Sequence, residues 1–186
     1  MTDLMRCAWC GTDPVYQAYH DTEWGRPIHD PRALWEALCL ESFQAGLSWI
    51  TILRRRKDFR AAFAGFDPQI VAGWGEVDIT RLLANPRIIR HRGKIAATIA
   101  SAAIYLKIEA DIGFSTFLWD HVGAKPLQTH RDSDPVATIP QAIYLSKSLK
   151  SAGFKYCGPT ITYAFMQAVG MVNDHHITCH AYKHLF

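Results

Sequence analysis

Residues 147–170 read KSLKSAGFKYCGPTITYAFMQAVG, and this stretch indicates how the chain folds. Apolar residues at helical spacing lead to Gly153, and glycine commonly ends a helix in the left-handed conformation. A short connection follows, and Pro159 after Gly158 begins a second helix. Such a pair is either an ordinary αα-hairpin or a hairpin whose backbone N–H groups and second helix N-terminus bind phosphate oxygens. In the second case Lys155 adds a charged contact.

Most of the remaining chain shows helical periodicity, and strand-like alternation is almost absent. Helices are expected to begin at four points: Pro31, Pro68, Gly93 and Pro140. The apolar residues expected to face the core include Leu34, Trp35, Leu38, Ile70, Val71, Ile95, Ile99, Ala103 and Leu106. No linker composition divides the chain. The sequence therefore predicts a single all-α unit, 1–186, with the hairpin near 147–170.

Four potential metal ligands lie in two pairs, one near each end of the chain: Cys7 and His20, and His175 and Cys179. Two thiolates and two imidazoles suit one structural zinc ion, and a filled tetrahedral shell leaves no open position for catalysis. Because His175 and Cys179 are four residues apart, a helical turn would point both side chains the same way. Such a zinc ion would clip the two termini together.

Three other residues could compete for this metal. Cys10 forms a Cys-x-x-Cys pair with Cys7, so it could replace Cys7 as a ligand. His180 and His184 lie in the short C-terminal tail, where they could replace the expected ligands.

Composition limits the class of protein. The 186 residues are 49% hydrophobic with a net charge of +3, which fits a globular domain and says little about nucleic acid. No apolar run is long enough for a bilayer, and the start of the chain lacks a secretory signal. Five cysteines make no even disulfide framework. We therefore expect a cytoplasmic protein without a membrane partner.

Glu41 follows the apolar face of the helix expected after Pro31. A carboxylate beside so much apolar surface is costly unless it is paired or used. Aromatic residues in the neighbouring segments could surround it: Trp9, Tyr16, Tyr19, Trp24 and Trp49. These rings are either ordinary core or the walls of a cavity. A cavity of rings with one carboxylate suits a cationic purine, through stacking, cation–π attraction and a hydrogen bond to the exocyclic amine.

Several motifs resemble the 3-methyladenine DNA glycosylase I family of the helix–hairpin–helix superfamily. They are Trp9, DPVY (13–16), YHD (19–21), EWG (23–25), QAGLSWI (44–50), IIRHRGKI (88–95), GFK (153–155), GPT (158–160), FMQ (165–167) and VNDH (172–175). The resemblance runs nearly end to end. It implies an all-helical glycosylase fold whose termini are clipped by a structural zinc at Cys7, His20, His175 and Cys179.

The resemblance also implies a function. The protein would be a monomeric DNA glycosylase that initiates base excision repair by hydrolysing the glycosidic bond of 3-methyladenine in double-stranded alkylated DNA. Glu41 would be the catalytic residue, and Trp9, Tyr16, Tyr19, Trp24 and Trp49 would form the base pocket. The residues contacting DNA would be Gly46, Leu47, Lys155 and Gly158, with Leu47 filling the gap left by the extruded base.

Other functions remain as alternatives. Bifunctional members of the superfamily place a lysine nucleophile just inside the second hairpin helix, where this chain has no amine, so lyase activity is not expected. A zinc-dependent base deaminase requires His-x-Glu and Pro-Cys-x-x-Cys, which the spacing here does not match. A redox role for Cys7 and Cys10 needs a βαβ context that is lacking. A non-catalytic, zinc-stapled DNA-binding module would explain the hairpin but leave Glu41 without a purpose.

Overall fold

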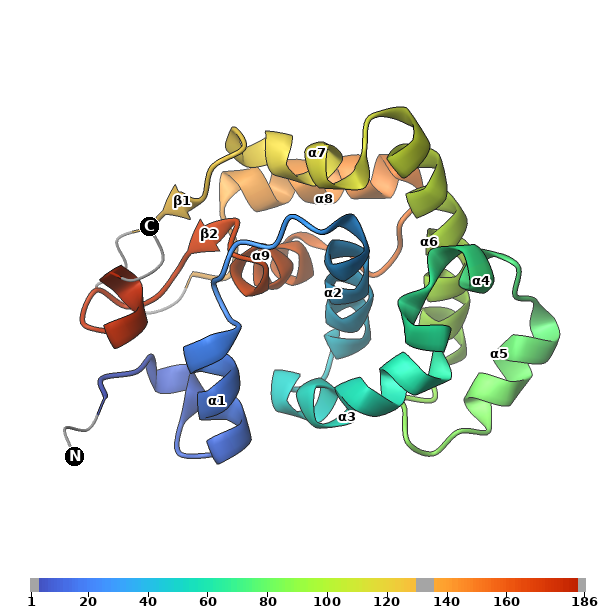
Figure 1. Ribbon diagram of the computed structural model, residues 1–186, viewed down its shortest axis with the longest axis horizontal. Coiled ribbons are helices and arrows are strands. Elements are labelled where there is room, and N and C mark those ends of the chain that lie inside the picture. The colour runs from blue at the N-terminus through green and yellow to red at the C-terminus, as the bar shows by residue number, and fades with distance from the viewer. Residues whose placement is uncertain (1–3, 130–135, 184–186) are drawn as a thin grey trace.

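A computed structural model describes residues 4–129 and 136–183, and this part of the chain is mostly helical (Figure 1). The α-helices are α1 (Pro14–Thr22), α2 (Pro31–Gln44), α3 (Trp49–Ala62), α4 (Pro68–Ala72), α5 (Glu76–Leu83), α6 (Arg92–Asp111), α7 (Phe114–Trp119), α8 (Pro140–Ala152) and α9 (Pro159–Ala168). Short 3-10 turns are η1 (Ala8–Cys10), η2 (Ala64–Phe66), η3 (Asp120–Val122) and η4 (His180–Lys183). None of the described helices has the length and apolar character required to cross a membrane.

Three helices begin with the same capping motif, an aspartate followed by a proline. Asp13, Asp30 and Asp67 each accept hydrogen bonds from backbone N–H groups of the first turn of α1, α2 and α4. The proline at the first helical position has no N–H group to leave unsatisfied, and its fixed φ suits a helix. These caps set where the three helices begin.

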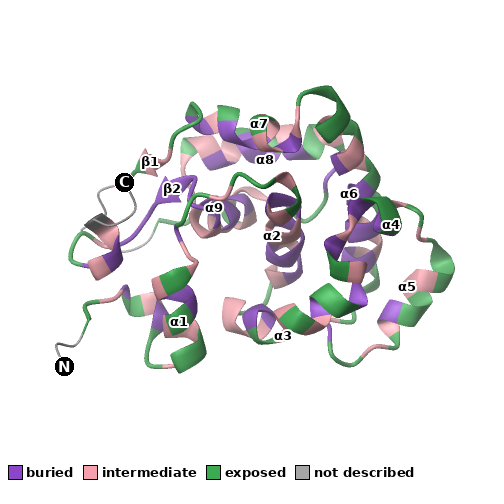
Figure 2. Ribbon diagram, in the orientation of Figure 1, coloured by how far each residue is buried: buried purple, intermediate pink, exposed green. Residues whose placement is uncertain are grey.

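Helix α2 forms the centre of the fold, packing against α3, α6, α7 and α9 (Figure 1). Leu34, Trp35 and Phe43 on α2 are completely buried, and the ring of Phe43 lies 4.7 Å from that of Phe59 on α3. Figure 2 shows buried positions along α2 and α9. Helix α2 also carries Glu41, so this residue lies on a helix that packs against four others.

The structure confirms the predicted helical fold and differs from the prediction in two details. A short parallel pair, β1 (Leu127–Gln128) with β2 (Val172–Asn173), joins two distant segments. Sequence periodicity missed it because each strand has two residues. Ile70 and Ala103, which were expected in the core, are exposed. Val71, which was also expected in the core, is buried, and Ala102 is buried in place of Ala103.

Candidate functional site: a buried carboxylate beside a cysteine–histidine cluster

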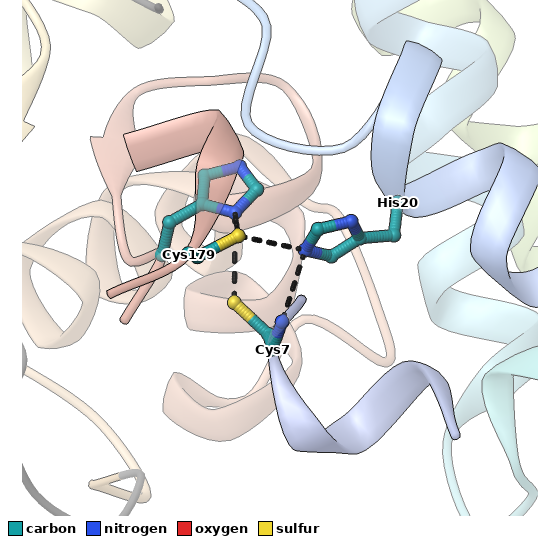
Figure 3. Close-up of side chains that lie close together, drawn as sticks. Cys7, His20 and Cys179 are labelled. Carbon is teal, nitrogen blue, oxygen red and sulfur yellow. Dashed lines mark hydrogen bonds between the residues drawn. The ribbon is translucent and has the colours of Figure 1, made fainter. Parts of the chain in front are cut away.

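The four predicted metal ligands meet in the structure. Cys7, His20, His175 and Cys179 are all buried, and their potential ligand atoms lie within 4.8 Å of one another. Figure 3 shows side chains of Cys7, His20 and Cys179 pointing toward a common centre, with His20 coming from α1. The cluster joins the two ends of the described chain. It could hold one metal ion.

Its geometry fits tetrahedral zinc. The Cys179 sulfur lies 3.4 Å from Nε2 of His20 and 3.5 Å from Nδ1 of His175. The Cys7 sulfur lies 3.5 Å from the same Nδ1. Zinc–sulfur bonds of about 2.3 Å and zinc–nitrogen bonds of about 2.05 Å at the tetrahedral angle place sulfur and nitrogen about 3.6 Å apart. The donor set is therefore arranged as a zinc shell requires.

The electrostatics favour a thiolate in this cluster. The hydrogen bond with Cys7, together with those from His175 and His20, lowers the pKa of the Cys179 thiol to about 2. The same bond with Cys179, together with burial, raises the pKa of Cys7. These contacts favour the thiolate form of Cys179, which is the form that binds a metal ion.

Both histidines are held by groups behind them. Nδ1 of His20 lies 2.8 Å from Asp21, and Nε2 of His175 lies 3.4 Å from the backbone oxygen of Trp24. Arg6 donates to Asp21 at 2.8 Å. A carboxylate or carbonyl behind a ligating imidazole fixes its tautomer and its ring orientation. This role of Asp21 was not predicted from the sequence, although its position next to His20 could have indicated it.

The competing ligands are placed elsewhere. The Cys10 sulfur donates to the backbone oxygen of Cys7 at 3.1 Å and is not part of the four-residue cluster. His180 contacts Asp21 at 3.0 Å, forming a second group with His20 and Asp21 behind the cluster. His184 lies outside the described residues. The expected helical turn between His175 and Cys179 is wrong, because this segment is a non-helical turn closed by a 2.8 Å bond from Cys179 N to the His176 oxygen.

Glu41 is the second unusual feature of the molecule. The residue is only 3% exposed, and within the described chain no hydrogen bond or ion pair to its carboxylate is found. Burial raises the pKa of Glu41 to about 8. A buried carboxylate without a partner is costly in free energy, and perturbed groups of this kind concentrate at functional sites.

Aromatic rings from three elements form a cluster, and two of its tyrosines lie near this carboxylate. Tyr19 on α1 lies 5.6 Å from Trp49 at the start of α3, ring centre to ring centre. Trp9 in η1 lies 4.9 Å from Tyr16 and 6.3 Å from Tyr19. Burial and the charge of Glu41 raise the pKa of both tyrosines, which places them within electrostatic range of that carboxylate.

Polar atoms of this region also lack partners. The indole nitrogens of Trp9 and Trp49 and the side-chain oxygen of Gln44 are buried without a hydrogen bond. Unsatisfied buried polar atoms are uncommon in folded proteins, and several in one region are typical of a ligand site. The two donors belong to the ring cluster, and the acceptor belongs to Gln44, three residues after Glu41 on α2.

Trp24 belongs to a different environment from the other predicted pocket residues. Its ring lies 4.6 Å from that of His175 and 6.1 Å from that of His20. Trp9 lies between the two groups, 4.9 Å from Trp24. Trp24 thus packs against the metal cluster and contacts Trp9 on the side of the aromatic site.

Ion pairs fasten α1, which carries the tyrosines, to α3. Arg54 binds Asp13, and Arg56 forms a two-pronged pair with Glu23 that includes a bond of 2.8 Å. These arginines belong to the basic run at 54–57, so part of that run serves to join helices. These ion pairs join α1, which carries Tyr16 and Tyr19, to α3, which begins at Trp49.

The 44–47 loop connects α2 to α3 at the surface. Gly46 has a φ of +80°, a left-handed conformation that favours glycine. Leu47 is 40% exposed, an unusual setting for a leucine. The Gln44 side chain donates to the Leu47 oxygen at 2.9 Å, and Leu47 N donates to the Gln44 oxygen at 2.7 Å. The loop therefore presents one apolar side chain on a braced turn.

The hairpin at 153–158 lies between α8 and α9, as expected. Gly153 ends α8 with a φ of +108°, and Gly158 precedes α9. No side chain caps the N-terminus of α9, so its first backbone N–H groups remain available to an anion. Lys155 is exposed beside it.

Comparison with known proteins identifies the family of this chain. Residues 9–182 match the family described as Methyladenine glycosylase. DNA-3-methyladenine glycosylase 1 of Escherichia coli (strain K12) is 48% identical over 184 residues, covering 96% of this chain and 97% of the relative. A crystal structure of 3-methyladenine DNA glycosylase I matches with a TM-score of 0.93 at 48% identity, covering 95% of this chain and 98% of that one.

A further solved structure is a tyrosine-to-phenylalanine variant of 3-methyladenine DNA glycosylase I in complex with 3-methyladenine. It matches with a TM-score of 0.91 at 42% identity, covering 95% of this chain and 97% of that one. Fold, motifs and length thus agree along nearly the whole molecule. This chain belongs to the methyladenine glycosylase family.

Proposed function

We propose that this protein removes 3-methyladenine from alkylated DNA by hydrolysing its N-glycosidic bond, the first step of base excision repair. The family relationship supports this activity. The main support for the site is Glu41, a carboxylate that has no compensating charge among the described residues and whose pKa is raised by burial. A positively charged base supplies that charge when it enters beside the aromatic rings.

Each residue of the site has a chemical task. Glu41 accepts a hydrogen bond from the exocyclic amine and stabilises the cationic base. Trp49 stacks on that base, and Tyr16 and Tyr19 close the sides of the pocket. Trp9 completes the wall and separates the pocket from the metal cluster. The carboxylate favours the methylated cation over neutral adenine, and this preference is the source of selectivity.

The reaction requires little acid catalysis. Methylation at N3 gives the base a positive charge, so the base departs as a neutral molecule when the glycosidic bond breaks. Water then captures the sugar. The Asp174 carboxylate accepts hydrogen bonds from Thr129 at 2.7 Å and from Gln167, which supports a structural role for this residue. The site therefore works by selecting and holding the extruded cation.

Access to the base requires that the nucleotide leave the duplex, which costs a few kcal/mol and least for a damaged base. Leu47 on the 44–47 loop enters the gap, with Gly46 giving the turn its shape. The hairpin holds the phosphate backbone through Lys155, the backbone at Gly158 and the free N-terminus of α9. One monomer of the chain is sufficient for this arrangement.

Replacing Leu47 with Ala is expected to slow excision from duplex DNA by about tenfold, because an apolar wedge no longer fills the vacated stack. Binding of free 3-methyladenine is expected to stay unchanged, since the pocket is intact. Single-turnover rates on methylated duplex and titration with the free base measure the two quantities. An equal loss of excision rate and of affinity for the free base would show that Leu47 does not act as a wedge.

The Cys7, His20, His175 and Cys179 cluster is proposed to hold one structural zinc ion. Its fit rests on the sulfur–nitrogen distances and on the supports behind both histidines. All four positions of a tetrahedral shell are filled by protein, so the ion supplies stability and takes no part in the reaction. It fixes η1, and therefore Trp9, against α1.

Chromatography of bases released from methylated DNA tests the activity. The protein is expected to release 3-methyladenine in proportion to its concentration. A non-catalytic DNA-binding module would bind the same DNA and release no base. Zinc analysis of the same preparation is expected to give one ion per chain.

A further inference from the structure

Lys94 is an unusual lysine. It lies in the first turn of α6, is only 6% exposed, and donates to two backbone oxygens, that of Phe43 at 2.8 Å and that of Ala45 at 2.5 Å. Burial lowers its pKa. Its ammonium group points into the protein and not toward the solvent.

The two oxygens that Lys94 binds stand on either side of Gln44, the last residue of α2. Carbonyl groups at a helix C-terminus lack partners within the helix and carry partial negative charge. A buried ammonium group satisfies them and fixes the direction in which the chain leaves α2. The chain leaves into the 44–47 loop, which carries Leu47 two residues after the second of these oxygens.

The same turn of α6 contacts the hairpin. A Cβ atom at Gly93 would lie 2.4 Å from the hydroxyl oxygen of Tyr156, so only glycine permits this approach. Tyr156 is a hairpin residue with a φ of +57°, and its ring lies 6.0 Å from the Lys94 ammonium nitrogen and from the His91 ring. His91 also caps α6 by accepting a bond from Lys94 N at 3.2 Å.

We propose that Lys94 is a positioning residue that holds the 44–47 loop in register with the hairpin through the Gly93–Tyr156 contact. The inference rests on the function proposed above, in which both segments touch DNA. Loop and hairpin must engage one duplex at a fixed separation, so that the wedge enters at the nucleotide whose flanking phosphates the hairpin holds. The first turn of α6 contacts both segments and sets that separation.

Replacing Lys94 with Met keeps the length of the side chain and removes its charge. At saturating enzyme, the single-turnover rate on methylated duplex is expected to fall by about 100-fold, whereas the affinity for free 3-methyladenine changes by less than about twofold. Glu41 is expected to stay in place because it lies within α2, which the buried core holds. The defect should shrink when the lesion lies opposite an abasic site, where extrusion is easier.

Several controls separate this role from a purely structural one. Lys107→Met changes an exposed lysine on the same helix and is expected to leave both quantities unchanged. Lys94→Arg keeps a cation and should recover part of the rate. If Lys94→Met does not fold, Gly93→Ala provides a second test, because the added methyl group displaces Tyr156. This variant is also expected to lower the single-turnover rate on methylated duplex and to leave the affinity for free 3-methyladenine unchanged.

Parallel loss of duplex activity and free-base affinity in Lys94→Met would overturn the inference, as would an unchanged duplex rate. An equal loss of rate on a lesion opposite a normal base and on a lesion opposite an abasic site would also contradict it. The wild-type protein separates the two hypotheses. If the proposed function is wrong, wild-type protein releases no 3-methyladenine; if only the role of Lys94 is wrong, wild-type protein still releases it.

Discussion

Replacing Glu41 with Gln is expected to lower the single-turnover rate of 3-methyladenine release by about 100- to 1000-fold. The amide keeps the shape of the side chain but has no charge to offset the cationic base. Loss of stabilisation inside a buried pocket costs more than the same loss in water. Chromatography of released base from methylated duplex measures the effect.

The same substitution should stabilise the folded protein. The pKa of Glu41 is raised from 4.5 to about 8, so above pH 4.5 the folded state binds a proton that the unfolded state has lost. This linkage lowers wild-type stability as pH rises from about 4.5 to about 8, by up to about 3 kcal/mol at pH 7. Urea unfolding should therefore find Glu41→Gln more stable than wild type at pH 7, and the difference should vanish near pH 4.5.

A matched control is available on the same helix. Glu36 accepts a bond from Arg60 at 2.7 Å near the surface, and Glu36→Gln is expected to change the excision rate by less than about twofold. Wild-type kcat/KM is expected to rise with pH toward about 8 as Glu41 ionises, and Glu41→Gln should lack this rise. A Glu41→Gln variant with the wild-type rate would remove the carboxylate from recognition.

Replacing Cys7 with Ser is expected to remove zinc and to unfold the region that joins the termini. A structural zinc ion contributes about 10 kcal/mol or more in small zinc domains, and binding is coupled to folding. The variant should therefore contain well under one zinc ion per chain and melt far below wild type. Metal analysis and thermal unfolding measure the two effects.

Cys10→Ser is the control, because Cys10 is buried three residues away, lies outside the cluster, and can keep its hydrogen bond to the Cys7 oxygen as serine. We expect it to retain one zinc ion per chain. A chelator should reduce wild-type stability, with loss of activity following unfolding. Immediate loss of activity from a protein that stays folded would contradict a structural role for the ion.

Much of the fold could be predicted from local sequence. Asp-Pro pairs before α2 and α4, and glycines at 153 and 158, act through backbone geometry within a few residues, so the start and end of these helices were visible. The four metal ligands were also visible, because cysteine and histidine are restricted in their chemistry. Ile70 was misplaced because a helix of five residues is too short for periodicity to fix which face is buried.

The arrangement of the site depends on contacts between distant segments, and sequence patterns do not report these. Trp24 lies near the other aromatic residues in sequence, yet its ring packs on His175, which comes from the other end of the chain. Lys94 lies in a basic cluster, yet it turns inward to reach the end of α2. A long flexible side chain can point either way, and only the packed structure decides.

A crystal structure of the protein soaked with 3-methyladenine tests the central claim most directly. We expect the base stacked on Trp49, with its exocyclic amine within hydrogen-bond distance of the Glu41 carboxylate and Tyr19 at its edge. The base bound away from these side chains, or a pocket filled by the protein's own side chains, would contradict the account.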